Sequence, residues 1–330
     1  MAKLLEVRNA DVVFSSGFGG RDKKVALDNV SLAVGGPDPA ITAVVGESGS
    51  GKTTLIRMLL GFQRPTRGEV IYDGRPVARM DGAGQRRFRR EVQAIFQDPF
   101  DAFNPFHRVD HPLLAPLNTF GLVTSRDEAY AKIEKTLRSV GLDPAVTLGK
   151  YPHQLSGGQR QRVMIARALL LDPEIILADE PVSMVDASLR STILDILYGL
   201  NRDLGISLIY VTHDLTTAYQ VADSIVVLHG GRIMEVGATE QVIHDPQHPY
   251  TKALIDAVPS PDPDTPWNLD EVADSPARFA PAGEPLALYR TDPLRAVAGP
   301  IRPGADPVTA ADIQLAVSEA KRRGGAPAAA

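Results

Sequence analysis

The sequence of 330 residues contains no cysteine. This absence excludes disulfides, thiolate metal sites, cysteine nucleophiles and cysteine-ligated iron–sulfur clusters. Long apolar runs are also missing, because no stretch approaches the roughly 20 residues that a membrane-spanning helix needs. The amino-terminal residues turn polar too soon for a secretory signal, so we expect a cytoplasmic chain. A net charge of −5 offers no basic surface for nucleic acid, and we expect no nucleic-acid partner.

The remaining composition is that of a globular α/β protein, with 44% hydrophobic and 23% charged residues. Short β-branched or apolar runs alternate with helical patterns along most of the chain. Between about 97 and 149, loops and an amphipathic helix predict a helical insertion in the α/β core. The expected strands are 4–14, 25–34, 41–45, 68–72, 92–96, 175–178, 207–212, 224–228 and 232–236, and the expected helices are 52–60, 125–140, 156–171, 187–204 and 215–222. Gly230 and Gly231 predict a hairpin between the last two strands.

Beyond Pro259 the texture of the sequence changes. Prolines crowd 259–266 and resist helix and sheet, which indicates a linker. A last helix is expected over 310–323, and 324–330 is expected to be a disordered tail. We therefore predict a main domain over 1–258, with its helical insertion at about 98–172, and a small proline-rich carboxyl-terminal appendage over 259–330.

A phosphate-binding loop is predicted directly after the apolar strand 41–45. Residues 46–53 fit the pattern GxxxxGK[ST] and lead into a helix. Glycines let successive backbone N–H groups point at phosphate oxygens, and the helix start adds a positive dipole. Lys52 is expected on the β- and γ-phosphates and the Thr53 hydroxyl on magnesium; the alternative is a glycine-rich turn without a ligand. The expected binding residues of this loop are Gly46, Glu47, Ser48, Gly49, Ser50, Gly51, Lys52, Thr53 and Thr54.

Two carboxylates end the apolar strand 175–178, where ligands sit in open α/β sheets. We expect Asp179 to hold magnesium through water and Glu180 to act as the general base that polarises the attacking water. Taken alone, two acids at a strand end would more often be solvated caps. The phosphate loop upstream favours the catalytic interpretation.

The string Leu155-Ser156-Gly157-Gly158-Gln159, followed by Arg160-Gln161-Arg162, distinguishes among phosphate-binding proteins. A serine and two glycines at a helix start present a hydroxyl, bare amides and a helix dipole to phosphate. The string resembles the signature motif of the ABC ATPase family, and the resemblance covers about residues 4–260. It implies a P-loop ABC ATPase core with an antiparallel β subdomain, which binds ATP and Mg²⁺ and hydrolyses ATP.

The same resemblance assigns roles to further positions. Phe14 corresponds to an aromatic that stacks on adenine, although a buried core aromatic is the alternative. Gln97 resembles the glutamine that contacts magnesium, and Ser183 and Asp186 resemble a loop that crosses a dimer interface. His213 resembles the switch histidine that contacts the γ-phosphate and positions the water, so Glu180 and His213 are the expected catalytic pair.

The family's architecture implies a head-to-tail dimer that encloses two ATP molecules. Ser156, with Gly157, Gly158 and Gln159, should therefore act on ATP bound to the partner's phosphate loop. Two transmembrane permease subunits are implied as further partners, which would hold this chain at the cytoplasmic face of the inner membrane. The second ATPase is either identical to this chain or a homologue of it.

Two strings resemble one branch of the family, namely 97–105 and His248-Pro249-Tyr250 with the residues after it. This branch imports oligopeptides, dipeptides, nickel or oligosaccharides, which implies an extracytoplasmic solute-binding protein as another partner. Many members carry a carboxyl-terminal cysteine cluster; this chain has none, so we expect no iron–sulfur cluster. Export, or a mechanical process other than transport, is the alternative function.

A run of arginines precedes the strand at 92–96. Its members are Arg86, Arg87, Arg89 and Arg90. We interpret the run as the solvated face of a helix. The alternative is a contact with lipid headgroups or with a membrane subunit.

Overall fold

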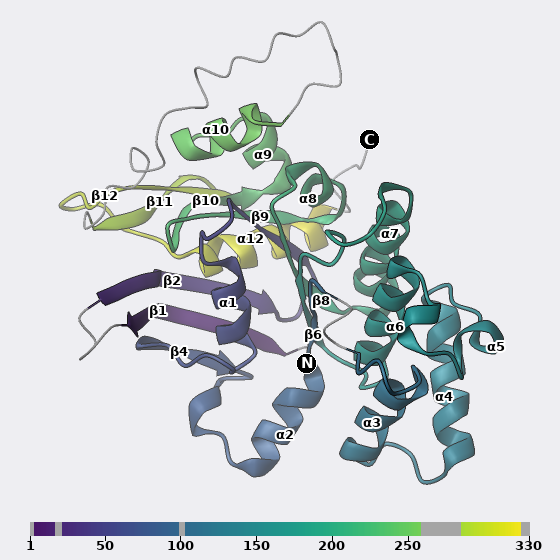
Figure 1. The fold of residues 1–330 in the computed structure, drawn as a ribbon. Coiled ribbons are helices and arrows are strands. Elements are labelled where there is room, and N and C mark those ends of the chain that lie inside the picture. Colours follow the sequence, from purple (N-terminus) through teal and green to yellow (C-terminus); the bar gives the residue numbers. More distant parts are fainter. Residues whose placement is uncertain (1–2, 17–21, 99–102, 259–284, 325–330) are drawn as a thin grey trace, which may run out of the picture. The chain divides into compact units, whose positions relative to one another are not determined.

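The computed structural model describes residues 3–16, 22–98, 103–258 and 285–324 (Figure 1). The chain forms two compact units, a first unit of residues 1–79 and 211–330 and a second unit of residues 80–210. The expected linker at 259–266 lies outside the described residues, as does nearly all of the expected tail. Within the described ranges, no helix is both long enough and apolar enough to cross a membrane.

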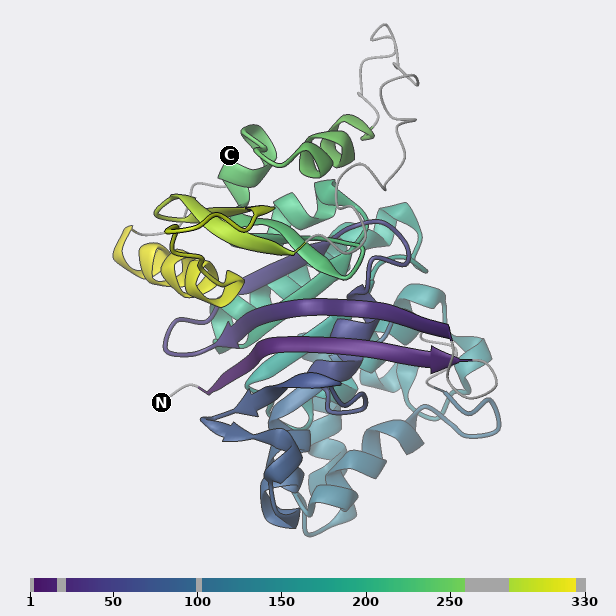
Figure 2. The ribbon, with the colours of Figure 1, turned by 90° about the vertical axis from the view of Figure 1, so that its left-hand side faces the viewer.

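The first unit contains an antiparallel sheet with the strand order β2-β1-β4-β5. Its strands are β1 (Leu4–Ser16), β2 (Asp22–Gly35), β4 (Arg67–Tyr72) and β5 (Arg75–Pro76). The two long strands lie side by side in Figure 2, where they run the length of the sheet. This sheet is the antiparallel subdomain that the family resemblance implies.

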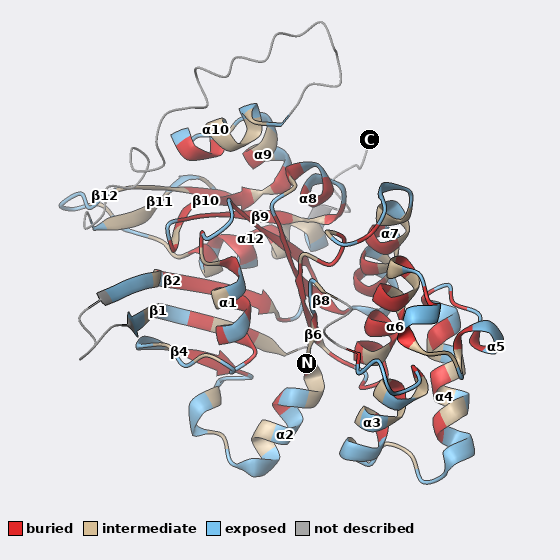
Figure 3. Ribbon diagram, in the orientation of Figure 1, coloured by how far each residue is buried: buried red, intermediate tan, exposed pale blue. Residues whose placement is uncertain are grey.

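A second sheet of the first unit carries the phosphate loop. Its strands follow the order β11-β12-β10-β9-β3. They are β3 (Ile41–Val45), β9 (Ser224–His229), β10 (Arg232–Ala238), β11 (Leu286–Asp292) and β12 (Arg295–Pro300). β3 pairs in parallel with β9, and both strands are buried along their whole length. Figure 3 shows the burial of β9. Continuous apolar strands of this kind need cover on both faces.

The first unit also contains helices. They are α1 (Lys52–Leu59), α8 (Leu215–Val221), α9 (Thr239–His244), α10 (Pro249–Asp256) and α12 (Ala310–Gly324), with the short 3₁₀ turn η1 (Val77–Arg79). The expected strands and helices of this unit are present, and Gly230 and Gly231 join β9 to β10 as a hairpin.

The carboxyl-terminal residues are more ordered than the sequence predicts. The hairpin β11–β12 was not expected, and it extends the sheet by pairing β12 with β10 over Glu235–Gly237. The helix expected over 310–323 is present as α12, which packs on β2 and β10 (Figure 2). Residues 286–324 thus contribute two strands and a helix to the first unit. The boundary predicted at 258 remains a prediction.

The second unit contains the parallel strands β6 (Val92–Ile95) and β7 (Ile175–Asp179). Its last strand is β8 (Ser207–Thr212), whose final residues Val211 and Thr212 are assigned to the first unit. Its helices are α2 (Gly82–Glu91), α3 (Asp110–Phe120), α4 (Arg126–Ser139), α5 (Pro144–Thr147), α6 (Gly157–Leu169) and α7 (Ala187–Leu204), with the 3₁₀ turn η2 (Pro152–Gln154). Helices α3 to α5 occupy the region predicted as a helical insertion.

The arginine run lies on α2, as expected. Arg87 pairs with Glu91 one turn further along, with 3.2 Å between nitrogen and oxygen. Arg90 donates to the Leu171 carbonyl at 3.2 Å. These contacts belong to the second unit itself.

Candidate functional site

Backbone contacts make glycine necessary at two positions of the phosphate loop. A Cβ on Gly46 would lie 2.1 Å from the Leu228 carbonyl oxygen of β9. A Cβ on Gly51 would lie 2.6 Å from the Ala26 carbonyl oxygen, and Gly51 has a φ of 109°. Both contacts involve backbone, which cannot swing aside as a side chain does. The loop is therefore held closely between β9 and β2.

The loop residues leave a position suited to an anion. Gly51 begins α1 without a side-chain cap, and no acidic residue lies in the first turn of the helix. Its first N–H groups thus lack the usual side-chain acceptor. Lys52 is 6% exposed, and its Nζ donates to the carbonyls of Gly46 and Glu47 at 2.7 and 2.8 Å. A buried cation beside uncapped amides fits a phosphate group.

A buried hydroxyl points to the same chemistry. Ser50 is 1% exposed, and its Oγ has no hydrogen-bond partner among the described residues. An orphaned polar atom of this kind costs roughly 1–3 kcal/mol unless a ligand or water satisfies it. Glu47, Ser48, Gly49 and Thr53 are exposed, and Thr54 is half-buried. The loop thus combines an exposed rim with a polar interior.

Two other predicted residues of the first unit lie away from this loop in the sequence. Phe14 on β1 is 43% exposed, so it is not the buried core aromatic that was the alternative. His213 is exposed in the turn between β8 and α8, which Asp214 caps by accepting from the Thr216 N–H at 2.9 Å. Both side chains are therefore exposed, and their contact with a ligand remains a prediction.

The second unit brings two predicted residues into contact. The Gln97 Nε2 donates to the Glu180 Oε2 at 3.1 Å. Glu180 follows β7 with a φ of 45°, the left-handed region that a residue with a Cβ seldom adopts. Such strain costs on the order of 1–3 kcal/mol and is found at functional positions. Asp179, the last residue of β7, is 6% exposed.

The oxygen donors of Thr53, Gln97 and Asp179 are of the type that Mg²⁺ prefers. In the described part of the chain, no group of three His, Cys, Asp or Glu side chains forms a metal site by itself. Thr53 belongs to the first unit, whereas Gln97 and Asp179 belong to the second, so their joint coordination of Mg²⁺ remains a prediction.

The signature string begins α6 through a reciprocal cap. The Ser156 Oγ accepts from the Gln159 N–H at 3.2 Å, and the Gln159 Oε1 accepts from the Ser156 N–H at 3.0 Å. A hydroxyl carries a donor as well as acceptor lone pairs, so this cap leaves the Ser156 proton for a ligand. Gly158 is buried, and a Cβ there would lie 2.8 Å from the Leu189 side chain.

The loop with Ser183 and Asp186 closes on itself after Glu180. The Ser183 Oγ donates to the Glu180 carbonyl at 2.9 Å. Asp186 begins α7 and is exposed, while the neighbouring Val185 is buried. The predicted residues thus fall into two groups, one on each unit. The first comprises Phe14, the phosphate loop and His213, and the second comprises Gln97, Ser156–Gln159, Asp179, Glu180, Ser183 and Asp186.

Two residues beside the phosphate loop were not predicted. The Tyr250 hydroxyl accepts from the Glu47 N–H at 3.1 Å. The His229 Nδ1 lies 3.0 Å from the Glu47 Oε1. Tyr250 belongs to a string that the sequence analysis used only to identify a branch of the family. Its separation of 203 positions from Glu47 left no local signal of this contact.

Comparisons with known proteins agree with this geometry. The family described as ABC transporter matches residues 27–183, and the family described as the carboxyl-terminal region of oligopeptide/dipeptide transporters matches residues 234–283. The dipeptide transport ATP-binding protein DppF of Lactococcus lactis is 38% identical over 284 residues, which cover 86% of this chain and 88% of that protein. The oligopeptide transport ATP-binding protein OppF of Streptococcus mutans is 38% identical, over 79% of this chain and 83% of that protein.

Among solved structures, a dimeric post-hydrolysis ATP-binding cassette bound to ADP and Pi matches with a TM-score of 0.64 and 29% identity, covering 71% of this chain and 98% of that one. The chain belongs to the ATP-binding proteins of the ABC transporter family and is an ATPase. Within this family it falls in the oligopeptide/dipeptide branch.

Proposed function

We propose that this chain hydrolyses ATP to drive the uptake of oligopeptides or dipeptides through partner permease subunits. The observation that carries the proposal is the phosphate loop, in which buried Lys52 lies beside the uncapped start of α1. The import of peptides is supported by the names of the relatives in the same branch.

Hydrolysis requires a water held against the γ-phosphate and a base for its proton. Glu180 is the proposed base, and its hydrogen bond with Gln97 fixes the orientation of the carboxylate. His213 is proposed to contact the γ-phosphate and to position the same water. Thr53, Gln97 and Asp179 are the proposed magnesium ligands, directly or through water, and the ion would neutralise charge on the phosphates.

The working unit is proposed to be a head-to-tail dimer. One chain contributes Lys52 and Glu180 to each site, and the other contributes Ser156 at the start of α6, with Ser183 and Asp186 at the interface. The dimeric cassette among the similar structures supports a dimer. Through the permease subunits, the dimer would be bound to the cytoplasmic face of the membrane, with a solute-binding protein delivering the peptide outside.

The experiment combines hydrolysis with transport. Vesicles are prepared with the two permease subunits in the membrane and with the ATPase and ATP inside. Solute-binding protein carrying a labelled dipeptide is then added outside. If the chain powers import, the label should accumulate inside the vesicles, on the side of the ATP. We expect Glu180→Gln to lower kcat by at least about a hundredfold with ATP affinity retained. Glu134→Gln, which removes an exposed charge on α4, should change neither the rate of ATP hydrolysis nor the rate of dipeptide uptake. Hydrolysis that survives Glu180→Gln would refute the proposed base, and ATP-dependent extrusion would refute import.

A further inference from the structure

A buried tyrosine from the carboxyl-terminal part of the family domain holds the backbone of the phosphate loop. Tyr250 lies on α10 and is 5% exposed. Its hydroxyl oxygen accepts from the N–H of Glu47, the second residue of the loop, at 3.1 Å. The peptide plane that precedes Glu47 is therefore fixed from outside the loop. This plane also carries the Gly46 carbonyl, to which Lys52 donates.

The side chain of Glu47 lies close to a second residue, His229. The His229 Nδ1, at the end of β9, lies 3.0 Å from the Glu47 Oε1. The ring of His229 also packs on the ring of Tyr250, with 4.2 Å between their centroids. Tyr250 thus holds the backbone of Glu47, and His229 lies beside its carboxylate. Neither residue belongs to the motifs that define the nucleotide site.

The position of Tyr250 depends on a buried carboxylate. Glu235 of β10 is fully buried, and its carboxylate accepts from the N–H groups of Gln247 and His248 at 3.1 and 2.9 Å. The His248 Nδ1 in turn accepts from the Tyr250 N–H at 3.1 Å and caps α10. A buried carboxylate whose oxygens accept from backbone N–H groups fixes the segment that supplies them.

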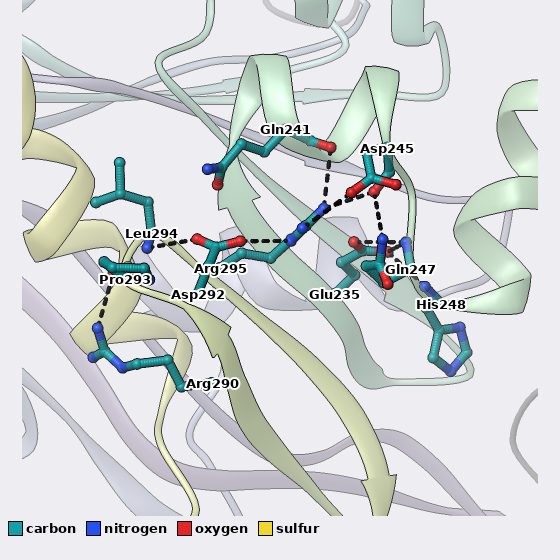
Figure 4. Close-up of polar contacts among 10 residues, drawn as sticks. All are labelled: Glu235, Gln241, Asp245, Gln247, His248, Arg290, Asp292, Pro293, Leu294 and Arg295. Atoms are coloured by element: carbon teal, nitrogen blue, oxygen red, sulfur yellow. Dashed lines mark hydrogen bonds and ion pairs between the residues drawn. The ribbon is translucent and has the colours of Figure 1, made fainter.

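Residues 245–248 form the loop between α9 and α10, and the hairpin β11–β12 holds the other end of this 245–248 loop (Figure 4). Arg295 at the start of β12 donates to the Asp245 carbonyl at 2.6 Å and to its carboxylate at 3.2 Å, and also reaches the Gln241 carbonyl at 3.4 Å. Asp292 of β11 accepts from the Arg295 Nε at 3.0 Å. The Arg295 side chain is 10% exposed. A planar fork buried among these acceptors sets the end of α9 with little freedom.

These contacts form one series from the hairpin to the phosphate loop, through Arg295, the 245–248 loop, α10 and Tyr250. We propose that Tyr250 is a positioning residue of the nucleotide site and that the carboxyl-terminal hairpin acts on ATP affinity through Arg295. The inference rests on the proposed function, because it takes residues 46–53 to be the nucleotide site. It assigns the His248-Pro249-Tyr250 string a role in holding that loop.

The first test removes one hydroxyl. Tyr250→Phe keeps the ring on His229 but leaves the Glu47 N–H without its acceptor, so we expect the KM for ATP to rise about two- to tenfold with kcat nearly unchanged. The ATP dissociation constant, measured in a Glu180→Gln background to prevent turnover, should rise by the same factor. Tyr289→Phe is the matched control, because the Tyr289 hydroxyl accepts from the Arg302 N–H at 2.8 Å on the hairpin. That variant should leave both constants unchanged.

The second test weakens the far end of the series. Arg295→Lys keeps the charge but loses the fork, and it should raise the ATP dissociation constant in the same direction as Tyr250→Phe. Arg290→Lys is its control, because Arg290 donates to Pro293 within the hairpin and does not reach the 245–248 loop (Figure 4). The double variant of Tyr250 and Arg295 should be less than additive if both act through one series.

The results separate this inference from the proposed function. If Lys52→Ala abolishes ATP binding while Tyr250→Phe binds ATP normally, the positioning role is wrong and the nucleotide site stands. If Lys52→Ala binds ATP normally, the assignment of the site itself is wrong. A lower urea midpoint for Tyr250→Phe with an unchanged dissociation constant would reduce Tyr250 to a structural residue and overturn the inference.

Discussion

Gly46 occupies a point where the chain passes directly against another backbone. We predict that Gly46→Ala destabilises the first unit by about 3 kcal/mol and abolishes ATP binding, because its Cβ would lie 2.1 Å from the Leu228 carbonyl oxygen. Urea unfolding and ATP titration measure the two effects. Gly74→Ala is the control, since Gly74 has a φ of +74° but no atom near its Cβ. It should cost only about 1 kcal/mol and bind ATP normally.

His248 makes stability depend on pH. Burial, with a smaller contribution from the charge of His229, lowers the pKa of His248 to about 4 from 6.5. The unfolded chain therefore takes up the proton first as the pH falls. As a result, the contribution of His248 to the free energy of unfolding is complete above pH 6.5 and is lost as the pH falls from about 6.5 to 4. The titratable residues that act on or contact it are His229, Glu235 and Tyr250.

We predict a loss of about 2 kcal/mol from this group between pH 7 and pH 5. The midpoint of urea unfolding across this range measures it. His248→Asn retains an acceptor for the cap of α10 and cannot take up the proton, so its pH profile should be flatter by that amount. An identical profile for the variant and the parent chain would contradict the assignment to His248.

At the scale of elements, α12 covers the edge of a sheet. β2 is the last strand of its sheet, and the Ala33 N–H on that strand donates to the Gln314 Oε1 at 2.9 Å. We predict that Gln314→Leu destabilises the first unit by about 1–3 kcal/mol, because the buried N–H loses its acceptor. Leu315→Gln, at a side chain 39% exposed, should stay within about 0.5 kcal/mol. Urea unfolding of both variants checks the prediction; equal midpoints would contradict it.

The elements that carry local patterns were predicted well. β3, α1, β7 and α6 each have a continuous apolar run, a capping residue or a glycine at a fixed offset, and these signals lie within the segment itself. The hairpin β11–β12 has no such signal. Its pairing with β10 depends on residues about sixty positions upstream, such as Glu235 opposite Val297. Sequence patterns within a segment do not specify partners at this separation.

In the candidate site, too, residues with a local sequence signal were predicted and residues brought in by distant contacts were not. The phosphate loop and the two carboxylates at the end of β7 were predicted because the chemistry of phosphate and magnesium fixes residue types at short spacing. Other residues, such as Gln97 and His213, were predicted from the family resemblance. Tyr250 and His229 were missed, since an ordinary aromatic and an ordinary histidine in apolar surroundings resemble core residues. Only the fold brings them to Glu47. Predicting from sequence thus recovered the groups proposed to touch ATP and omitted those that hold them.

At the scale of the whole molecule, the two predicted half-sites can be separated by mutation. We predict that Lys52→Ala and Ser156→Asp are each inactive alone. Aspartate keeps the cap of α6 but repels phosphate. In an equal mixture, a head-to-tail dimer of the two variants regains one intact site, and the ATPase activity should recover to about a quarter of the parent value when chains pair at random.

The recovery should depend on mixing. Each variant measured alone at the same total concentration is the control, and a doubly substituted chain, Lys52→Ala with Ser156→Asp, should rescue neither variant. No recovery in any mixture would contradict the sharing of sites between copies of this chain.

The parallel pairing of β3 with β9 also affects the order of events during synthesis. Thr42 and Ser224 contact each other across these strands, although they are 182 positions apart in the chain. The strand before the phosphate loop thus leaves the ribosome long before its neighbour exists. The second unit, which is one continuous segment, is complete by then. A nascent chain released before β9 would carry the GxxxxGK[ST] sequence without the strand against which Gly46 packs. We therefore expect nucleotide binding to begin late in translation.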